Sequence, residues 1–213
     1  MLMNETQVIE SLSRLGFSED CIVEIIMVTL NEDGSPNPAP MGVSRRSGTL
    51  VVTPYKTSRT YRNLKRSGLA SINLTNDPLL YLATSFKDEI EEQPVTIDLC
   101  VEGVDGVIQT EIGEQFNEDD LKATFKLKPR NIDIKSPHPY VFSRGRSEAI
   151  EAIIHTTRIK VFHGQNQSEK VHKLVDKVKD CITTINKVST EGSAEIKVTT
   201  TLVSLIIKWG VEW

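Results

Sequence analysis

The sequence predicts a mainly β protein with added helices, of the α+β class. Between Cys21 and Lys135, short β-branched and apolar runs alternate with turn residues, which is typical of strands. From residue 143 onward the apolar residues recur at helical spacing instead. At 213 residues and 38% hydrophobic content the chain can bury a sizeable core. We therefore expect strands closed into a barrel, followed by a helical region.

The N-terminal segment predicts an amphipathic helix. Val8, Ile9, Leu12 and Leu15 form an apolar series that Glu and Ser residues interrupt, which does not suit a secretory leader. The longest apolar run, near Leu205, is far shorter than the ~20 residues of a membrane-spanning helix.

The cysteines also bear on location. Cys21, Cys100 and Cys181 are widely spaced and form no C-x-x-C pair, so neither a disulfide framework nor a structural zinc site is indicated. We expect buried thiols in a cytoplasmic protein.

Residues 21–48 predict a β-hairpin whose return strand carries Pro36, Pro38 and Pro40. Successive N–H groups of a strand point to opposite edges, so the three missing donors fall on one edge. That edge cannot donate a normal ladder, and we expect it to border solvent, a bulge or a ligand. Gly42 follows, where the backbone is free of side-chain bulk.

A strand, a short helix and another strand come next. Thr49 to Thr53 predicts a strand that ends at Pro54, and Thr57 or Ser58 can cap a helix that Gly68 terminates. Leu69 to Leu74 then predicts a strand with alternating faces. Its apolar face holds Ala70, Ile72 and Leu74, and the polar side chains opposite are Ser71, Asn73 and Thr75.

The remaining strands would close the barrel. They are predicted at residues 96–102, 106–112, 122–128 and 131–135. Residues 136–140 (SPHPY) read as a rigid connector, and helices follow at 143–159 and 167–188. The segment 194–213 stays open between helix and strand, because its many β-branched residues favour a strand. We thus expect a barrel domain over residues 1–142 and a helical region, packed on it, over 143–213.

A basic segment lies in the middle of this acidic chain, which has a net charge of −4. Between Asp33 and Asp77 no acidic residue occurs, and the segment holds seven basic ones: Arg45, Arg46, Lys56, Arg59, Arg62, Lys65 and Arg66. Positive charge near the start of a helix opposes the helix dipole, whereas a bound anion would reverse that effect. The helix start at residues 57–60 therefore predicts a phosphate cradle, and a solvated, capped basic helix is the alternative.

Three segments together resemble the FMN-binding split-barrel family, which includes flavin reductase-like and pyridoxamine phosphate oxidase-like proteins. They are GSPNPAPMGV (34–43), KTSRTYRNLKRSG (56–68) and SINLTNDP (71–78), in that order. With SRGRSEAIEAIIHTTRI (143–159), the resemblance is closest to an uncharacterised archaeal subfamily and covers most of the chain.

The resemblance implies FMN as the cofactor. It implies that Thr57, Ser58, Arg59 and Thr60 hold the phosphate, and that the flavin ring lies against the backbone of Pro40, Met41, Gly42, Val43 and Ser44. Asn73 and Thr75 would support these contacts. It further implies a homodimer with the flavin near the interface, and an oxidoreductase or flavin reductase of unknown substrate.

Two other functions stay open at this level. The basic surface could bind nucleic acid or another polyanion, although only Tyr55 and Tyr61 offer stacking partners. The barrel could also hold a deazaflavin, a haem or nothing. No catalytic residue stands out, and no histidine has a second ligand at metal spacing.

One stripe and one loop of charges remain. Arg144, Glu148, Glu151, His155 and Arg158 share one helical face. They form either a surface stripe of ion pairs or a partly buried network in which Glu151 raises the pKa of His155. The Glu-rich residues 87–92 read as a solvated loop.

Overall fold

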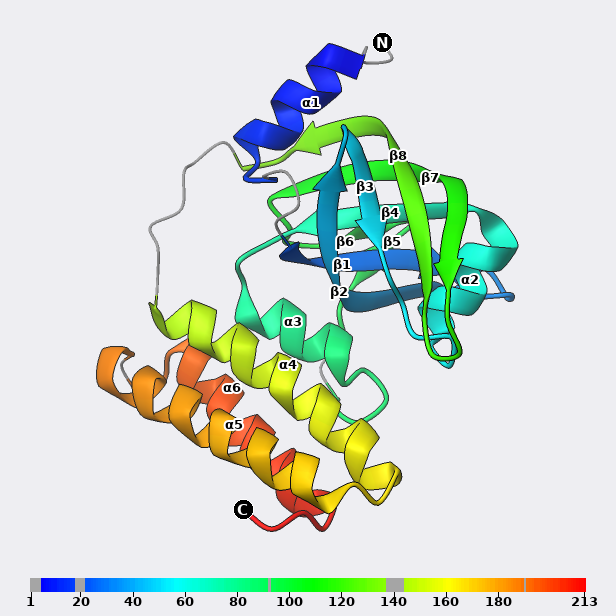
Figure 1. Ribbon diagram of the computed structural model, residues 1–213. Helices are drawn as coiled ribbons and strands as arrows, with labels where there is room; N and C mark the ends of the chain where they lie inside the picture. Colours follow the sequence, from blue (N-terminus) through cyan, green and yellow to red (C-terminus); the bar gives the residue numbers. More distant parts are fainter. Residues whose placement is uncertain (1–4, 18–21, 92, 137–143, 190) are drawn as a thin grey trace. The chain divides into compact units, whose positions relative to one another are not determined.

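The computed structural model describes residues 5–17, 22–91, 93–136, 144–189 and 191–213 (Figure 1). The chain divides into two compact units. The first comprises Met1–Thr75 and Gln93–His138, and the second comprises Asn76–Glu92 and Pro139–Trp213.

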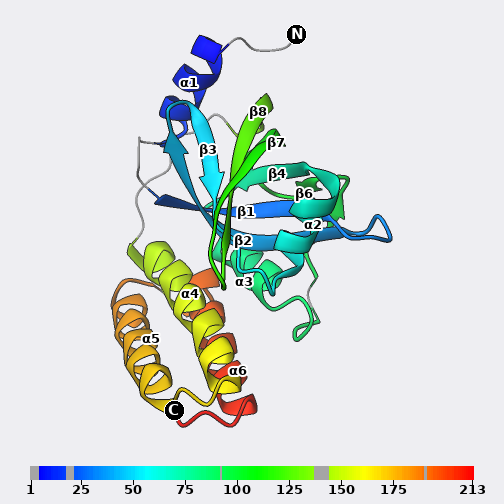
Figure 2. The ribbon, with the colours of Figure 1, turned by 45° about the vertical axis from the view of Figure 1, so that its right-hand side comes forward.

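The first unit is a closed barrel of six antiparallel strands in the order β1-β2-β3-β8-β7-β4 (Figures 1 and 2). The strands are β1 (Ile22–Leu30), β2 (Pro36–Arg46), β3 (Thr49–Val52), β4 (Leu69–Leu74), β7 (Gly106–Glu118) and β8 (Ala123–Ile134). The predicted barrel is confirmed.

Alternation along the strands fills the barrel with apolar side chains. Met27, Leu50, Ile72, Ile108 and Leu127 are all fully buried in one cluster. Helix α1 (Glu5–Arg14) adds Val8 and Leu12 to the same core and lies at one end of the barrel, near β8. Burying each such side chain contributes about 1.5–3 kcal/mol, so the barrel and α1 fold as one body.

The three prolines of β2 lie in the part of the strand that pairs with β1 and not with β3. Strand β1 pairs with β2 along its whole length, with Leu30, Val28 and Ile26 opposite the three prolines. Strand β3 pairs with β2 only from Val43 to Arg46. Because β3 does not pair with this part of β2, N–H groups missing on the β3 side remove no hydrogen bond between these two strands.

Helix α2 (Arg59–Ser67) connects β3 to β4 and is bounded as predicted. Ser58 is the N-cap and Gly68 the C-cap, the latter at φ 68°, a left-handed conformation that glycine adopts without strain. The Gly68 N–H donates to the Leu64 carbonyl at 3.1 Å, and strand β4 starts at the next residue.

The predicted strand at 96–102 does not join the barrel. Instead, β5 (Thr96–Ile97) and β6 (Cys100–Val101) form a separate two-stranded hairpin. The tight turn between them leaves each strand too short to span a barrel wall.

The two predicted strands at 122–128 and 131–135 are one strand, β8. A register shift between Gln109 and Thr110 of β7 absorbs the interruption, with Thr110 opposite Pro129 and Gln109 opposite Asn131. A bulge of this kind lets a strand continue past a proline.

The second unit is helical. It contains α3 (Pro78–Ser85), α4 (Arg144–Gly164), α5 (Ser168–Val188) and α6 (Ala194–Lys208). Helix α6 settles the open segment, because its first turn is capped by Ser193 and it buries Val198, Leu202 and Ile206. Among the residues that the structure describes, no helix combines the length and apolar character needed to cross a membrane.

Helix α3 was not predicted, and it changes the unit boundary. The sequence prediction placed all of residues 1–142 in the barrel, whereas the segment Asn76–Glu92 clusters with the helices. The reason is packing: α3 contacts α4 and α6, and Phe86 stacks on Trp209 with ring centroids 5.9 Å apart. The predicted connector at 136–140 lies almost wholly outside the described residues.

Candidate functional site

The start of α2 is a helix end with its cap in place and no acidic residue in its first turn. Ser58 Oγ accepts the Tyr61 N–H at 3.1 Å and donates to the Tyr55 carbonyl at 2.7 Å. Thr57 and Arg59 are exposed beside it. The positive end of the helix dipole and the flanking cations therefore favour an anion here.

The segment before α2 is held by the turn between β7 and β8. The Lys56 N–H donates to the Leu121 carbonyl at 2.9 Å, and Tyr55 forms a bridge with Lys122, whose Nζ lies 4.4 Å from the ring centroid. Backbone N–H groups of Lys122 and Leu121 donate to Asp119 and hold the pKa of that carboxyl below its usual range. The site thus rests on two chain segments far apart in sequence.

The seven basic residues do not all lie at the helix start. Arg45 Nη1 donates to Ser13 Oγ of α1 at 2.6 Å, at the far end of β2. Asn37, which contacts α2, lies eight positions earlier on the same strand, about 26 Å away measured along the chain of the strand. Arg66 lies in the last turn of α2 and donates to the Leu30 carbonyl. Of the seven, Lys56, Arg59 and Arg62 lie nearest the helix start in sequence.

The predicted ring contacts occupy the middle of β2. Pro40, Met41 and Gly42 are half-buried, whereas Val43 is fully buried in the core and Ser44 is also buried. Of this stretch, Val43 and Ser44 pair with β3, whereas Pro40, Met41 and Gly42 do not.

The other predicted contacts have protein partners. Thr60 is 2% exposed, and its hydroxyl accepts from Asn37 Nδ2 at 3.4 Å. Asn73 is fully buried: it donates to the Leu99 carbonyl at 3.2 Å and accepts the Val101 N–H at 2.9 Å. Asn73 therefore holds the β5–β6 hairpin on the outer face of β4. Thr75 is half-buried at the end of that strand.

A buried polar cluster under α2 was missed in the sequence. Asn63 Nδ2 donates to Thr29 Oγ1 and to Asn31 Oδ1, both at 3.0 Å. Asn37 Nδ2 lies 3.3 Å from the same Thr29 oxygen. The only sequence signal was an asparagine next to Leu64 on the inward face of a short helix.

Residues 23–136, more than half of the 213, match the family described as "Protein of unknown function (DUF447) N-terminal domain". The chain belongs to the DUF447 family. An FMN-bound DUF447 protein from Methanosarcina mazei is 23% identical, with a TM-score of 0.75 over 91% of this chain and 98% of that one. The two proteins share their fold.

More distant structural similarity is to flavin proteins. The styrene monooxygenase flavin reductase from Pseudomonas putida S12 is 13% identical, with a TM-score of 0.46 over 54% of this chain and 82% of that one. A flavoredoxin from Methanosarcina acetivorans is 14% identical, with a TM-score of 0.44 over 57% and 72% respectively.

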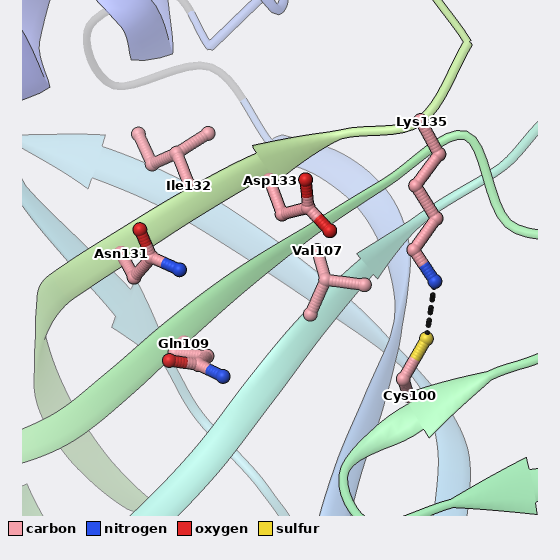
Figure 3. A pocket seen from close by; sticks show the side chains of 7 residues that line it. All are labelled: Cys100, Val107, Gln109, Asn131, Ile132, Asp133 and Lys135. Atoms are coloured by element: carbon pink, nitrogen blue, oxygen red, sulfur yellow. Dashed lines mark hydrogen bonds between the residues drawn. The ribbon is translucent and has the colours of Figure 1, made fainter.

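A hollow lies on the outside of the DUF447 barrel, between β6 and the β7–β8 pair (Figure 3). It has a volume of about 230 Å³ and is lined by Cys100, Val107, Gln109, Asn131, Ile132, Asp133 and Lys135. Lys135 Nζ donates to Cys100 Sγ at 2.8 Å, and this bond raises the pKa of the lysine. Cys100 is half-buried, and not fully buried as predicted.

The thiol of Cys181 is buried as predicted. Burial first, and then a hydrogen bond with Glu148, raise the pKa of this cysteine to about 12. Cys21 lies outside the described residues.

The charged stripe of α4 was predicted to be either a surface row of ion pairs or a partly buried network with a raised His155 pKa. The structure matches neither prediction in full. His155 is 6% exposed, and its Nε2 lies 3.3 Å from Glu151 Oε1, so the stripe is partly buried. The predicted direction of its pKa was wrong, however: loss of hydration lowers the pKa of His155 and outweighs the attraction of Glu151. The side chain of Arg144 lies outside the described residues.

The Glu-rich segment 87–92 is not simply a solvated loop. Glu89 forms an ion pair with Lys160, and its other carboxylate oxygen accepts from Trp209 Nε1 at 2.7 Å. Within the described ranges, no group of three or more His, Cys, Asp or Glu side chains is placed to hold a metal ion.

Proposed function

We propose that this chain binds FMN, with the phosphate at the start of α2 and the ring along β2 from Pro40 to Ser44. The observation that carries the proposal is the helix start: a capped first turn without acids, flanked by Thr57, Arg59 and Lys56. The FMN-bound relative of the same family and fold supports it.

The groups at this helix start fit a phosphate dianion. Backbone N–H groups of a first helical turn point at such a ligand, and a guanidinium can donate two parallel hydrogen bonds to it. Thr57 would add its hydroxyl. Because the Thr60 side chain is buried, we assign its contribution to the backbone N–H.

A ring along β2 would face an edge that lacks three backbone donors at Pro36, Pro38 and Pro40. Within Met41 to Ser44, strand alternation points the N–H groups of Gly42 and Ser44 to this same edge, so these two would be the donors closest to the ring. Bound FMN supplies the redox chemistry, and the chain supplies placement and electrostatics.

The first test compares two arginines of the barrel unit. Arg59→Ala should raise the Kd for FMN about tenfold or more, because a hydrogen bond to a charged group contributes roughly 1.5–3 kcal/mol. Arg130→Ala removes the same charge from β8, where the guanidinium pairs with Glu111, and should leave the Kd within about twofold. Flavin fluorescence quenching measures both.

Equal affinities in the two variants would refute the phosphate assignment. Salt-dependent RNA binding that both variants weaken equally would favour the nucleic-acid alternative instead. Neither the separated basic residues nor the relatives named above support that alternative.

The reaction and assembly stay predictions from the family resemblance. An oxidoreductase or flavin reductase would bleach the FMN absorbance under anaerobic NADH or NADPH, whereas an unchanged spectrum with both donors would argue against that activity. The resemblance also predicts a cytoplasmic homodimer with the flavin near the interface. Light scattering tests the dimer, which would have twice the chain mass of 23.8 kDa.

A further inference from the structure

Four polar side chains are buried between α2 and the β1–β2 pair. Thr29, Asn37, Thr60 and Asn63 are each 5% exposed or less. Burying uncompensated amides and hydroxyls costs free energy, and here the cost is offset because each group bonds to another member of the set.

The bonds anchor α2 at two points. Asn63 donates to Thr29 Oγ1 of β1 at 3.0 Å, and to Asn31 Oδ1, just beyond β1, at 3.0 Å. Thr60, one turn earlier on the same face, accepts from Asn37 of β2 at the longer distance of 3.4 Å. Thr29 Oγ1 joins the two anchors, since Asn37 Nδ2 also approaches it at 3.3 Å.

Two anchors on consecutive turns fix how deep the helix lies and how it is rotated about its axis. Apolar residues at positions 60 and 63 would bury as much surface, but hydrophobic contacts are not directional. Hydrogen bonds weaken steeply as their geometry departs from the optimum. The cluster is therefore suited to orienting the helix and not only to attaching it.

We infer that Asn63, acting with Thr29 and Asn37, is a positioning residue that gives the site its preference for a phosphorylated flavin. By holding the first turn of α2, the cluster aims the N–H groups at its start, and Arg59, at one point. This inference rests on the proposed function, because it assumes that the phosphate of FMN lies at that point.

The test measures the Kd of the full chain for FMN and for riboflavin, which lacks the phosphate. In Asn63→Leu, which keeps a side chain of similar size, the Kd for FMN should rise about tenfold. The Kd for riboflavin should change by less than about twofold, since the ring contacts on β2 are intact. The ratio of the riboflavin Kd to the FMN Kd, which measures the preference for the phosphate, should therefore fall about tenfold.

A matched control removes a buried hydrogen bond elsewhere in the same unit. Thr110 Oγ1 donates to the Ala70 carbonyl at 2.8 Å, and Thr110 is 3% exposed. Both Thr110→Val and Asn63→Leu should lower the melting temperature. Thr110→Val should leave the ratio of the riboflavin Kd to the FMN Kd unchanged. If Asn63→Leu does not fold, Thr60→Val can be used instead, because it removes only the accepting hydroxyl. It should also lower the ratio of the riboflavin Kd to the FMN Kd.

The outcomes separate the two proposals. A wild-type chain that binds FMN no better than riboflavin would overturn the phosphate assignment itself. A wild-type preference for FMN that survives in the Asn63 and Thr60 variants would overturn the positioning role while leaving the proposed function intact.

Discussion

Burial disfavours the protonated form of the His155 imidazole. Its Nδ1 is buried without a hydrogen-bond partner among the described residues, and its Nε2 meets Glu151 at 3.3 Å. Lys177 of α5 and Arg158 of α4 oppose the proton, whereas Glu148 favours it. The balance lowers the pKa of His155 below its ordinary value of 6.5, and loss of hydration is the largest cause.

The lowered pKa of His155 should make the chain less stable in acid. The unfolded chain binds a proton at His155 near pH 6.5 and the folded chain only at lower pH, so the free energy of unfolding should fall as the pH drops below about 6.5. His155→Gln should flatten this slope by at most about 1.4 kcal/mol per pH unit, the limit for one proton. Urea titrations between pH 7 and pH 5 measure it.

The matched control is His172→Gln, on the exposed side of α5. It changes the same residue type without removing a buried imidazole, so its slope should follow that of the wild type. Parallel slopes for the wild type and His155→Gln would contradict the assignment.

Single residues show how far the sequence could predict this site. Ser58 and Gly68 were predicted as possible caps from their types and spacing alone, because capping is local. The bonds of Asn63 could not be predicted, since its partners Thr29 and Asn31 lie more than thirty residues earlier and only the barrel topology brings them together.

Helix α2 owes its sharp end to a backbone conformation that can be tested apart from packing. Gly68 has φ 68°, and a Cβ added there would meet nothing within 4 Å. Gly68→Ala therefore changes only backbone strain, and should destabilise the chain by about 1–2 kcal/mol. Thermal denaturation followed by circular dichroism measures the loss.

Gly113→Ala in β7 is the control from the same unit. It has no left-handed φ, and its nearest contact is the Lys126 carbonyl at an ordinary 3.8 Å. We expect no loss of melting temperature for this variant. A similar loss in both variants would mean that glycine is needed for a reason other than the left-handed φ.

At the level of elements, the sequence predicted the bounds of a strand or helix correctly where its own residues carry the pattern. The bounds of β4 match the prediction residue for residue. Helix α3 was not predicted, although Asp77 and Pro78 form a typical N-cap and first turn. Pro129 divided β8 in the prediction, since the bulge that tolerates it depends on the partner strand.

At the scale of the whole molecule, the second unit takes a segment from the middle of the barrel sequence. Tyr81, Leu82 and Phe86 of this segment are each at most 4% exposed, and α3 contacts α4 and α6. Sequence alone did not place this segment, because the partners of α3 begin more than fifty residues later along the chain.

The assignment of residues 76–92 to the second unit can be tested with fragments of the chain. A fragment of residues 1–142 keeps α3 but loses α4 and α6, so the apolar face of α3 should become exposed to solvent and bind the dye ANS. In a matched fragment, a Gly/Ser linker of the same length replaces residues 76–92, and ANS fluorescence should fall several-fold. Far-UV circular dichroism checks that both fragments keep the barrel strands. Equal dye binding by two folded fragments would show that the exposed apolar surface belongs to the barrel, and that residues 76–92 fold with it.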